Sequence, residues 1–274
     1  MIFKYSAYNT LLSDLGRIDY VIEISEIAIR SFLKDINNAE NAESLLKEKS
    51  EEHKIFVSLD STNNYYNQVT LGHIANVYHL TETFFYELQN EYNTISSETW
   101  YFENKKTKLD QIITFFETKK RFNEIDQIEK YLYDTFVYYH QLRVYFSHKK
   151  TTSLSEINQK WETAKSHFDE NLLKKYKINS APKSFDKVDF EDYFLFTQIS
   201  KDMALKISSI CHPEPIGLCK FVTGLKKLKN ERLYNAVESE MKTRYSFIKE
   251  NDSDNLIQQI IDNLQGISSL ERRL

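Results

Sequence analysis

Apolar side chains recur every three or four residues along most of this chain, and this spacing constrains the fold more than any other feature of the sequence. Such spacing places the side chains on one face of an α-helix. Stripes of this kind lie within residues 11–32, 74–88, 109–116, 125–146, 154–168 and 256–267. No comparable run of strict apolar–polar alternation occurs. Because each stripe must be buried against another helix, the sequence predicts an all-α fold, an antiparallel helical bundle with additional C-terminal helices.

The residues that make turns are scarce. The chain has 5 glycines and 3 prolines among 274 residues, whereas the two types together ordinarily make up about 12% of a protein. Folds that need many glycines at turns and phosphate loops, such as β-sandwiches, Rossmann folds and P-loop enzymes, are therefore disfavoured. Phenylalanine and tyrosine number 18 each, so large rings are expected to supply much of the packing.

The charge balance and the cysteines narrow the class of protein. Net charge is −4, from 36 basic and 40 acidic residues, which disfavours non-specific binding of duplex DNA. No run of 18 apolar residues and no secretory leader pattern occur, so we expect a cytoplasmic protein without a membrane partner. Cys211 and Cys219 are too few for a disulfide framework. With His212 they still lack a fourth zinc ligand, and we expect neither a metal nor a cofactor.

Two stretches rich in loop signals divide the chain. Residues 177–187 contain Pro182 and show little periodicity. They are predicted to connect an N-terminal bundle, residues 1–176, to a C-terminal helical region, residues 188–274. The two parts are either separate domains or layers of one domain. Pro213 and Pro215 are predicted to end another helix near Ile210.

A capping signal fixes one helix boundary. Ser153 is followed three residues later by Glu156, just before an apolar periodic run. This is the pattern of a capping box, and it predicts that a helix begins at about Leu154. The preceding helix must therefore end before a link at about 149–152. His148 is then expected at the C-terminal end of that helix.

The same helix end carries Arg143 and His148, an R-x4-H arrangement. Cleavage of RNA by its own 2′-hydroxyl needs a group that moves protons and a cation that holds the phosphate. Histidine suits the first role because its pKa lies near neutrality, and arginine suits the second because its planar fork binds phosphate oxygens. Lys149 and Lys150 would add positive charge for binding RNA. A helix C-terminus also favours the imidazolium form of His148.

Helix geometry restricts this pair. Positions five apart on a regular helix differ by about 140° in azimuth, so Arg143 and His148 would not share a face. Either the last turn loosens before the loop, or a second copy of the chain completes the site across a two-fold axis. The helix predicted over residues 125–146 also carries seven aromatic side chains, more than one buried stripe holds. Rings left outside the bundle would favour a homodimer interface.

The segment around Arg143 and His148 resembles the HEPN superfamily, helical domains that bind nucleotides or cleave RNA and carry an R-x4–6-H motif at the end of a long helix. The helical context of this resemblance covers about residues 65–176. It implies a helical bundle, often dimeric, that cleaves RNA without a metal, with Arg143 and His148 as the catalytic pair. The residue after the arginine is commonly Asn in that family, and here it is Val144.

Four further residues are candidates for supporting roles. His140 precedes His148 by eight positions on the same predicted helix, and Ser147 lies beside His148. A packed histidine is the simpler interpretation of His140. His79 and Glu82 lie three apart on another predicted helix, where they are either a second layer of the site or an ordinary polar face.

Three functions follow from these observations. The leading one, implied by the HEPN resemblance, is an endoribonuclease that acts as a toxin or antiviral defence effector. RNA is then the substrate, and a cognate inhibitor or sensor protein is a further possible partner. The alternative is a non-catalytic HEPN-like module that binds RNA, nucleotides or a protein. The third is a helical scaffold, which predicts that Arg143 is exposed or paired with a carboxylate.

Overall fold

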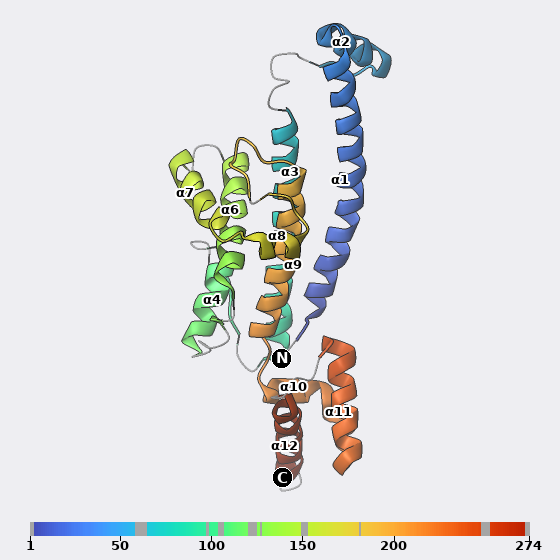
Figure 1. Cartoon of the computed structure of the whole chain (residues 1–274). Coiled ribbons are helices and arrows are strands. Elements are labelled where there is room, and N and C mark those ends of the chain that lie inside the picture. Colours follow the sequence, from blue (N-terminus) through green and yellow to red (C-terminus); the bar gives the residue numbers. More distant parts are fainter. Residues whose placement is uncertain are drawn as a thin grey trace. The chain divides into compact units, whose positions relative to one another are not determined.

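The structure is a computed structural model that describes residues 3–57, 65–96, 99–103, 107–119, 125–126, 128–148, 153–180, 182–247 and 253–271. Within these residues the regular structure is entirely helical (Figure 1). The prediction of an all-α fold is confirmed. The helices are α1 (Ser6–Asn38), α2 (Ala42–His53), α3 (Tyr65–Ile95), α4 (Lys108–Thr118), α6 (Lys130–Ser147), α7 (Leu154–Lys165), α8 (Glu170–Tyr176), α9 (Phe190–Ile210), α10 (Pro215–Val222), the 3₁₀ turn η2 (Thr223–Leu225), α11 (Asn230–Tyr245) and α12 (Ser253–Glu271).

Several predicted helix ends are confirmed, and one is wrong. Helix α9 ends at Ile210, ahead of the two prolines, and α7 begins at Leu154. The helix predicted from Ile125 begins instead at Lys130. The backbone N–H of Ile128 donates to the carbonyl of Ile125 at 2.9 Å, so a separate turn precedes α6. The spacing of apolar residues continues across that turn, because a turn with an i to i+3 hydrogen bond has nearly the same period as an α-helix.

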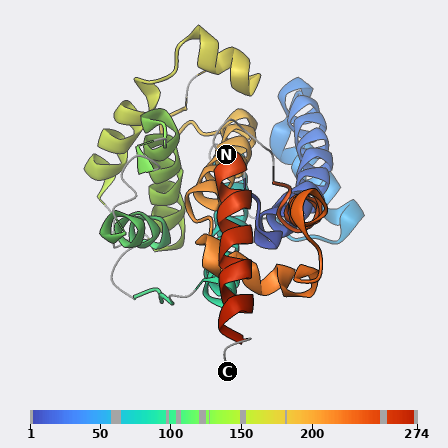
Figure 2. The ribbon, with the colours of Figure 1, turned by 90° about the horizontal axis from the view of Figure 1, so that it is seen from below.

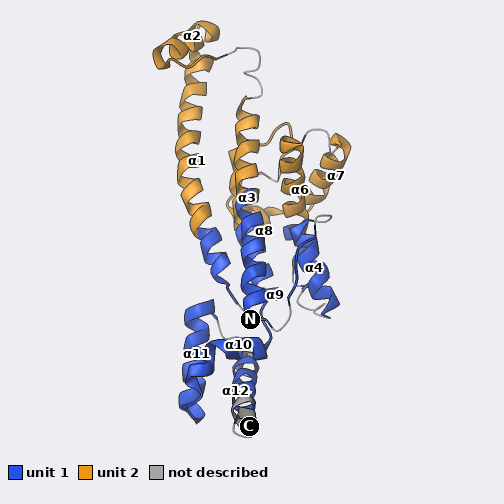
Figure 3. Ribbon diagram, turned by 180° about the vertical axis from the view of Figure 1, so that it is seen from behind, with its two compact units in different colours: residues 1–12, 79–133, 200–274 blue, residues 13–78, 134–199 orange. Residues whose placement is uncertain are grey.

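The chain divides into two compact units that interleave along the sequence (Figure 3). Unit 1 comprises residues 1–12, 79–133 and 200–274, and unit 2 comprises residues 13–78 and 134–199. Helices α1, α3, α6 and α9 each contain residues of both units. The predicted parts 1–176 and 188–274 each contribute to both units, and their independence as domains stays a prediction.

Tyrosines of α6 organise the core of unit 2. The hydroxyl of Tyr139 donates to Asp192 of α9 at 2.8 Å, and its ring lies 4.8 Å from that of Phe196. The hydroxyl of Tyr138 donates to the carbonyl of Lys183 in the connection before α9. Tyr138 and Tyr139 are both fully buried. These contacts hold α6 against α9 and thereby fix the orientation of the α6 surface that carries Arg143.

Unit 1 has its own core of aromatic rings and closely packed helices. The Trp100 ring stacks on that of Phe115 at 4.8 Å. Helix α10 packs against α12, the red helix of Figure 2, and α11 also contacts α12. A side chain at Gly217 would place its Cβ 2.4 Å from the carbonyl oxygen of Ile95. Glycine therefore allows α10 to approach the end of α3.

Candidate functional site

The C-terminal end of α6 has the local structure that the sequence predicts. Helix α6 ends at Ser147, and His148 is the next residue. The Ser153 hydroxyl accepts from the backbone N–H of Glu156, and the Glu156 carboxylate accepts from the backbone N–H of Ser153, both at 3.2 Å. This capping box begins α7 and is confirmed. Lys149 and Lys150 lie outside the described residues, so their predicted RNA-binding role stays a prediction.

Arg143 lies over an aromatic ring of α3. Its guanidinium carbon is 5.2 Å from the centroid of the Tyr78 ring, and the Arg143 side chain is half-buried. Tyr78 is 4% exposed. Among the described residues no carboxylate forms an ion pair with Arg143. A scaffold function predicted an exposed or carboxylate-paired arginine, and within those residues neither is found.

His140 contacts the same ring. The imidazole of His140 stacks on Tyr78 with the ring centroids 4.7 Å apart and the planes inclined by 17°. His140 and Arg143 are three positions apart on α6, so they share one face of the helix. Ser147, four positions after Arg143, lies on the same side and is exposed. The structure thus brings together His140, Arg143 and Tyr78, which we call the Tyr78 cluster.

Sequence reasoning missed Tyr78. The residue directly follows Val77 in the apolar stripe of α3 and is four positions after Ile74, so its burial had a weak signal. The sequence contains no signal for the pairing of Tyr78 with α6, because Tyr78 and Arg143 are 65 positions apart and meet only through tertiary packing.

His148 is not on the face of the Tyr78 cluster. Its backbone N–H donates to the carbonyl of Val144 at 2.7 Å, so the last turn of α6 is a regular α-turn and does not loosen before His148. The backbone positions of Arg143 and His148 therefore differ by about 140° in azimuth. The His148 side chain is exposed. Within one copy of the chain, the described geometry separates the two residues of the R-x4-H motif.

His79 and Glu82 lie on the part of α3 that belongs to unit 1. The His79 side chain is exposed and that of Glu82 is half-buried. The Tyr78 cluster belongs to unit 2. The supporting role of His79 and Glu82 stays a prediction.

The aromatic rings of α6 are divided between the core and the partly exposed surface of the chain. Phe136, Tyr138 and Tyr139 are buried, and the remaining rings, Tyr131, Tyr133, Tyr145 and Phe146, are half-buried. The expectation that rings outside the core of the bundle favour a homodimer interface stays a prediction, since four of the seven rings are half-buried. Phe136 and Tyr139 contact Phe196 of α9, and Tyr145 contacts Phe185 in the connection before α9. A count of rings along one helix does not anticipate these contacts.

A second histidine site was also missed by the sequence analysis. Nε2 of His167, just after α7, lies 2.7 Å from a carboxylate oxygen of Asp134 on α6. Both side chains are largely buried, at 23% and 17% exposed. The pair ties the end of α7 to α6, and the chain offers no sequence motif that would have joined two residues 33 positions apart.

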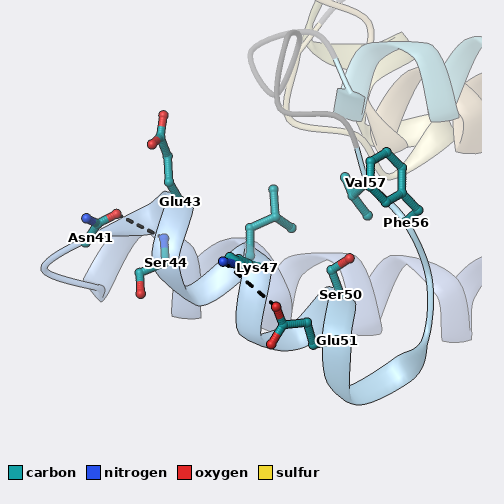
Figure 4. Close-up of a pocket in the computed structure, with 9 residues that line it drawn as sticks. Asn41, Glu43, Ser44, Lys47, Ser50, Glu51, Phe56 and Val57 are labelled. Atoms are coloured by element: carbon teal, nitrogen blue, oxygen red, sulfur yellow. Dashed lines mark hydrogen bonds and ion pairs between the residues drawn. The ribbon is translucent and has the colours of Figure 1, made fainter.

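No predicted site residue lines either of two hollows in the described surface. One, about 560 Å³ in volume, lies along α2 (Figure 4). There the side chain of Asn41 caps the helix by accepting from the backbone N–H of Ser44, and Lys47 faces Glu51. The other, about 420 Å³, lies in unit 1 between α3 and α11.

Neither a metal-binding cluster nor a membrane-spanning helix occurs in the described part of the chain. No group of three or more His, Cys, Asp or Glu side chains there is arranged to hold a metal ion. Cys211 and Cys219 are buried free thiols. None of the described helices has both the length and the apolar character needed to span a bilayer.

Comparison with models of protein families, with curated proteins and with solved structures finds no match for this chain.

Proposed function

We propose that the C-terminal end of α6 is the active site of a metal-independent endoribonuclease of HEPN type. The observation that carries the proposal is the position of Arg143, which is half-buried on the same Tyr78 ring that stacks on the His140 imidazole. When one face of a guanidinium packs on an aromatic ring, the N–H groups in the guanidinium plane still point outward and can bind phosphate oxygens. The resemblance of the R-x4-H motif to HEPN proteins adds the expectation of a cytoplasmic toxin or antiviral defence effector.

The chemistry assigned to these residues is transesterification within the RNA. A histidine takes the proton of the 2′-hydroxyl, and the resulting oxygen attacks the adjacent phosphorus. The bond to the 5′-oxygen breaks, and a second imidazole, in its protonated form, gives that oxygen a proton. Arg143 neutralises the charge that develops on the phosphate oxygens. The products are a 2′,3′-cyclic phosphate and a 5′-hydroxyl, and no metal takes part.

In this proposal His148 comes from a second copy of the chain. The regular last turn of α6 separates Arg143 from His148 of the same copy, and a two-fold arrangement would bring two such pairs to one cleft. A homodimer is therefore part of the proposed function, on the ground of helix geometry.

The test is RNA cleavage by the purified protein in the presence of EDTA, with product ends identified by mass spectrometry. Arg143→Ala and His148→Ala should each lower the rate by roughly 10²–10⁴. His140→Ala should cost much less if its role is to pack on Tyr78. His53→Ala, at the exposed C-terminal end of α2, is the matched control for a histidine at a helix end and should leave the rate unchanged.

Unchanged cleavage in both Arg143→Ala and His148→Ala would contradict the proposal. Retention of activity on DNA would contradict it as well, because DNA lacks the 2′-hydroxyl that serves as nucleophile. Growth arrest on expression, lost in both variants, is the expected result in cells.

A second candidate function is a non-catalytic module that binds RNA, nucleotides or a partner protein. The observation that favours it is the separation of Arg143 and His148 on a regular helix, which leaves the half-buried Arg143 and His140, both in contact with the buried Tyr78 ring, as a binding surface for a phosphate. It predicts RNA binding that depends on Arg143, without cleavage and without any effect of His148→Ala.

A further inference from the structure

Helix α1 is apolar on two opposite sides. Its inner side carries the predicted stripe that includes Leu11, Leu15 and Ile22, which are at most 4% exposed. Its outer side carries a second apolar set with large exposed fractions: Tyr20 67%, Val21 60%, Ile24 50% and Ile27 69%. Isolated exposed apolar residues are common on proteins, but a contiguous set of four on one helix face marks an interaction surface.

The outer set has the spacing of a helix–helix seam. Tyr20, Ile24, Ile27 and Ser31 follow one another at intervals of four, three and four, which is the alternation of the two core positions of a coiled coil. The next positions at either end of this series are Arg17 and Lys34, and these charges end the apolar part. We call residues 20–31 on this side of α1 the outer seam.

We propose that the outer seam binds the same seam of a second copy of this chain, with the two α1 helices antiparallel. A two-fold axis between residues 25 and 26 places Ile24 against the partner's Ile27 and Tyr20 against the partner's Ser31. The symmetry repeats each layer, so both isoleucines of both copies enter one apolar centre. Val21 and the partner's Ala28 then flank it on one side.

Charge selects this arrangement. On the other flank of the seam, Glu23 of each copy faces the partner's Arg30, so the two-fold axis makes two pairs of opposite charge. Glu23 is exposed. Arg30 bonds Glu26 through Nε at 2.6 Å, and its guanidinium carbon lies 5.8 Å from the centroid of the Phe190 ring. Its side chain is still 63% exposed, so a carboxylate of a second copy can reach it. In a parallel pair, Glu23 would instead face the partner's Ala28 and meet no cation.

The seam is short, which sets the strength of the dimer. Residues 20–31 extend about 16 Å along the helix, so the area covered is below the roughly 800 Å² per partner of a standard interface. The expected dimer is reversible and concentration-dependent. It involves neither Arg143 nor His148, so it goes beyond the proposed function and does not rest on it.

Sedimentation equilibrium of the full chain tests self-association through this surface. Wild type should dimerise reversibly at micromolar concentrations. Ile27→Glu places two charges in the apolar centre and should raise the dissociation constant roughly tenfold or more. Because Ile27 is exposed, the melting temperature of the Ile27→Glu variant at low protein concentration should equal that of wild type. Phe56→Glu, at a residue 96% exposed outside the seam, is the matched control and should dimerise as wild type does.

Disulfide trapping tests the antiparallel register. The native thiols of Cys211 and Cys219 are buried, so an added surface cysteine reports its own surroundings. Tyr20→Cys mixed with Ser31→Cys should form a cross-linked heterodimer. Neither variant alone should cross-link, since identical positions lie about 16 Å apart in the antiparallel pair, beyond the roughly 7 Å limit for a disulfide.

Three results would overturn the proposal. The first is a wild-type chain that stays monomeric at hundreds of micromolar. The second is self-association with the same dissociation constants in wild type and Ile27→Glu. A dimer through α6, as in the proposed function, would persist in Ile27→Glu, so only the association lost in this variant is assigned to the outer seam. The third is cross-linking of Tyr20→Cys with itself and not with Ser31→Cys, which would mean a parallel pair. Loss of ribonuclease activity is not among the readouts, so the result is separate from that of the proposed function.

Discussion

Arg143 and Tyr78 are 65 positions apart in the chain, and the guanidinium carbon of one lies 5.2 Å from the ring centroid of the other. The ring of Tyr78 also stacks on His140. A single buried tyrosine of α3 therefore positions two polar side chains of α6. The contact gives the arginine a fixed location near the helix end, where a mobile side chain would lose entropy on binding a phosphate.

The first prediction concerns this ring. Tyr78→Leu removes the aromatic face and should weaken binding of a labelled single-stranded RNA by roughly 2- to 30-fold, because a cation–π contact contributes about 0.5–2 kcal/mol. Fluorescence anisotropy measures the change. Tyr78→Phe keeps the ring and should bind nearly as wild type does. Equal binding by the Leu and Phe variants would show that the ring does not position Arg143 for RNA.

The second prediction concerns the pH dependence of stability. Burial raises the pKa of Asp192 to about 7, although backbone N–H groups of Lys183 and Asp189 and the Tyr139 hydroxyl donate to it. Between about pH 4 and pH 7, the Asp192 carboxyl is therefore protonated in the folded chain and ionised in the unfolded chain, where its pKa is 3.8. This contribution to the free energy of unfolding is full below about pH 4 and is lost as pH rises to about 7. Its size is at most about 4 kcal/mol.

Urea denaturation between pH 4 and 8 measures this dependence, with Asp192→Asn as the comparison. The difference in free energy of unfolding between wild type and this variant should change across the window, because the amide does not titrate. Asp186→Asn, at an exposed residue of the same connection, should follow wild type at every pH. A constant difference for Asp192→Asn would contradict the raised pKa.

The third prediction has the opposite sign. Burial lowers the pKa of His73 below 6.5, and its Nε2 is buried without a hydrogen-bond partner among the described residues. The unfolded chain therefore binds a proton that the folded chain does not, and stability falls as pH drops below about 6.5. His73→Phe should remove this acid-dependent loss in urea denaturation. His53→Phe, at an exposed position, should retain it.

The fourth prediction tests the capping box at the start of α7. Ser153→Ala removes the acceptor for the Glu156 N–H and should lower the free energy of unfolding by about 1 kcal/mol. Thermal denaturation followed by circular dichroism measures the effect. Ser155→Ala, an exposed position within the first turn, should change stability by a few tenths of a kcal/mol at most. Equal losses in both variants would mean that the cap does not stabilise α7.

The HEPN resemblance rests on six positions of the sequence, and the fold adds only that these positions lie at the end of a helix in an all-α chain. The sequence-based choice of His148 as the partner of Arg143 stays a prediction. The structure adds His140 as the histidine that shares the arginine's helix face, and the two single-alanine variants distinguish between them.

Local features of the sequence determined the helices and several of their ends. The capping box begins α7 because Ser153 and Glu156 bond each other's backbone within one turn, and α9 ends at Ile210 because proline follows closely. Such features involve residues a few positions apart, so no knowledge of the rest of the chain is needed. The predicted start of α6 was wrong because apolar periodicity alone does not distinguish a helix from a preceding turn.

Only the tertiary structure decided what each helix face meets. The pairing of Tyr78 with Arg143 and of Tyr139 with Asp192 joins residues more than 50 positions apart. The burial of the α6 rings and the exposure of the outer seam of α1 depend equally on which helices pack together. Apolar spacing is the same for a stripe covered by a neighbouring helix and for one left in solvent. The sequence therefore specifies that a face is apolar, and the packing of the chain decides whether it becomes core or surface.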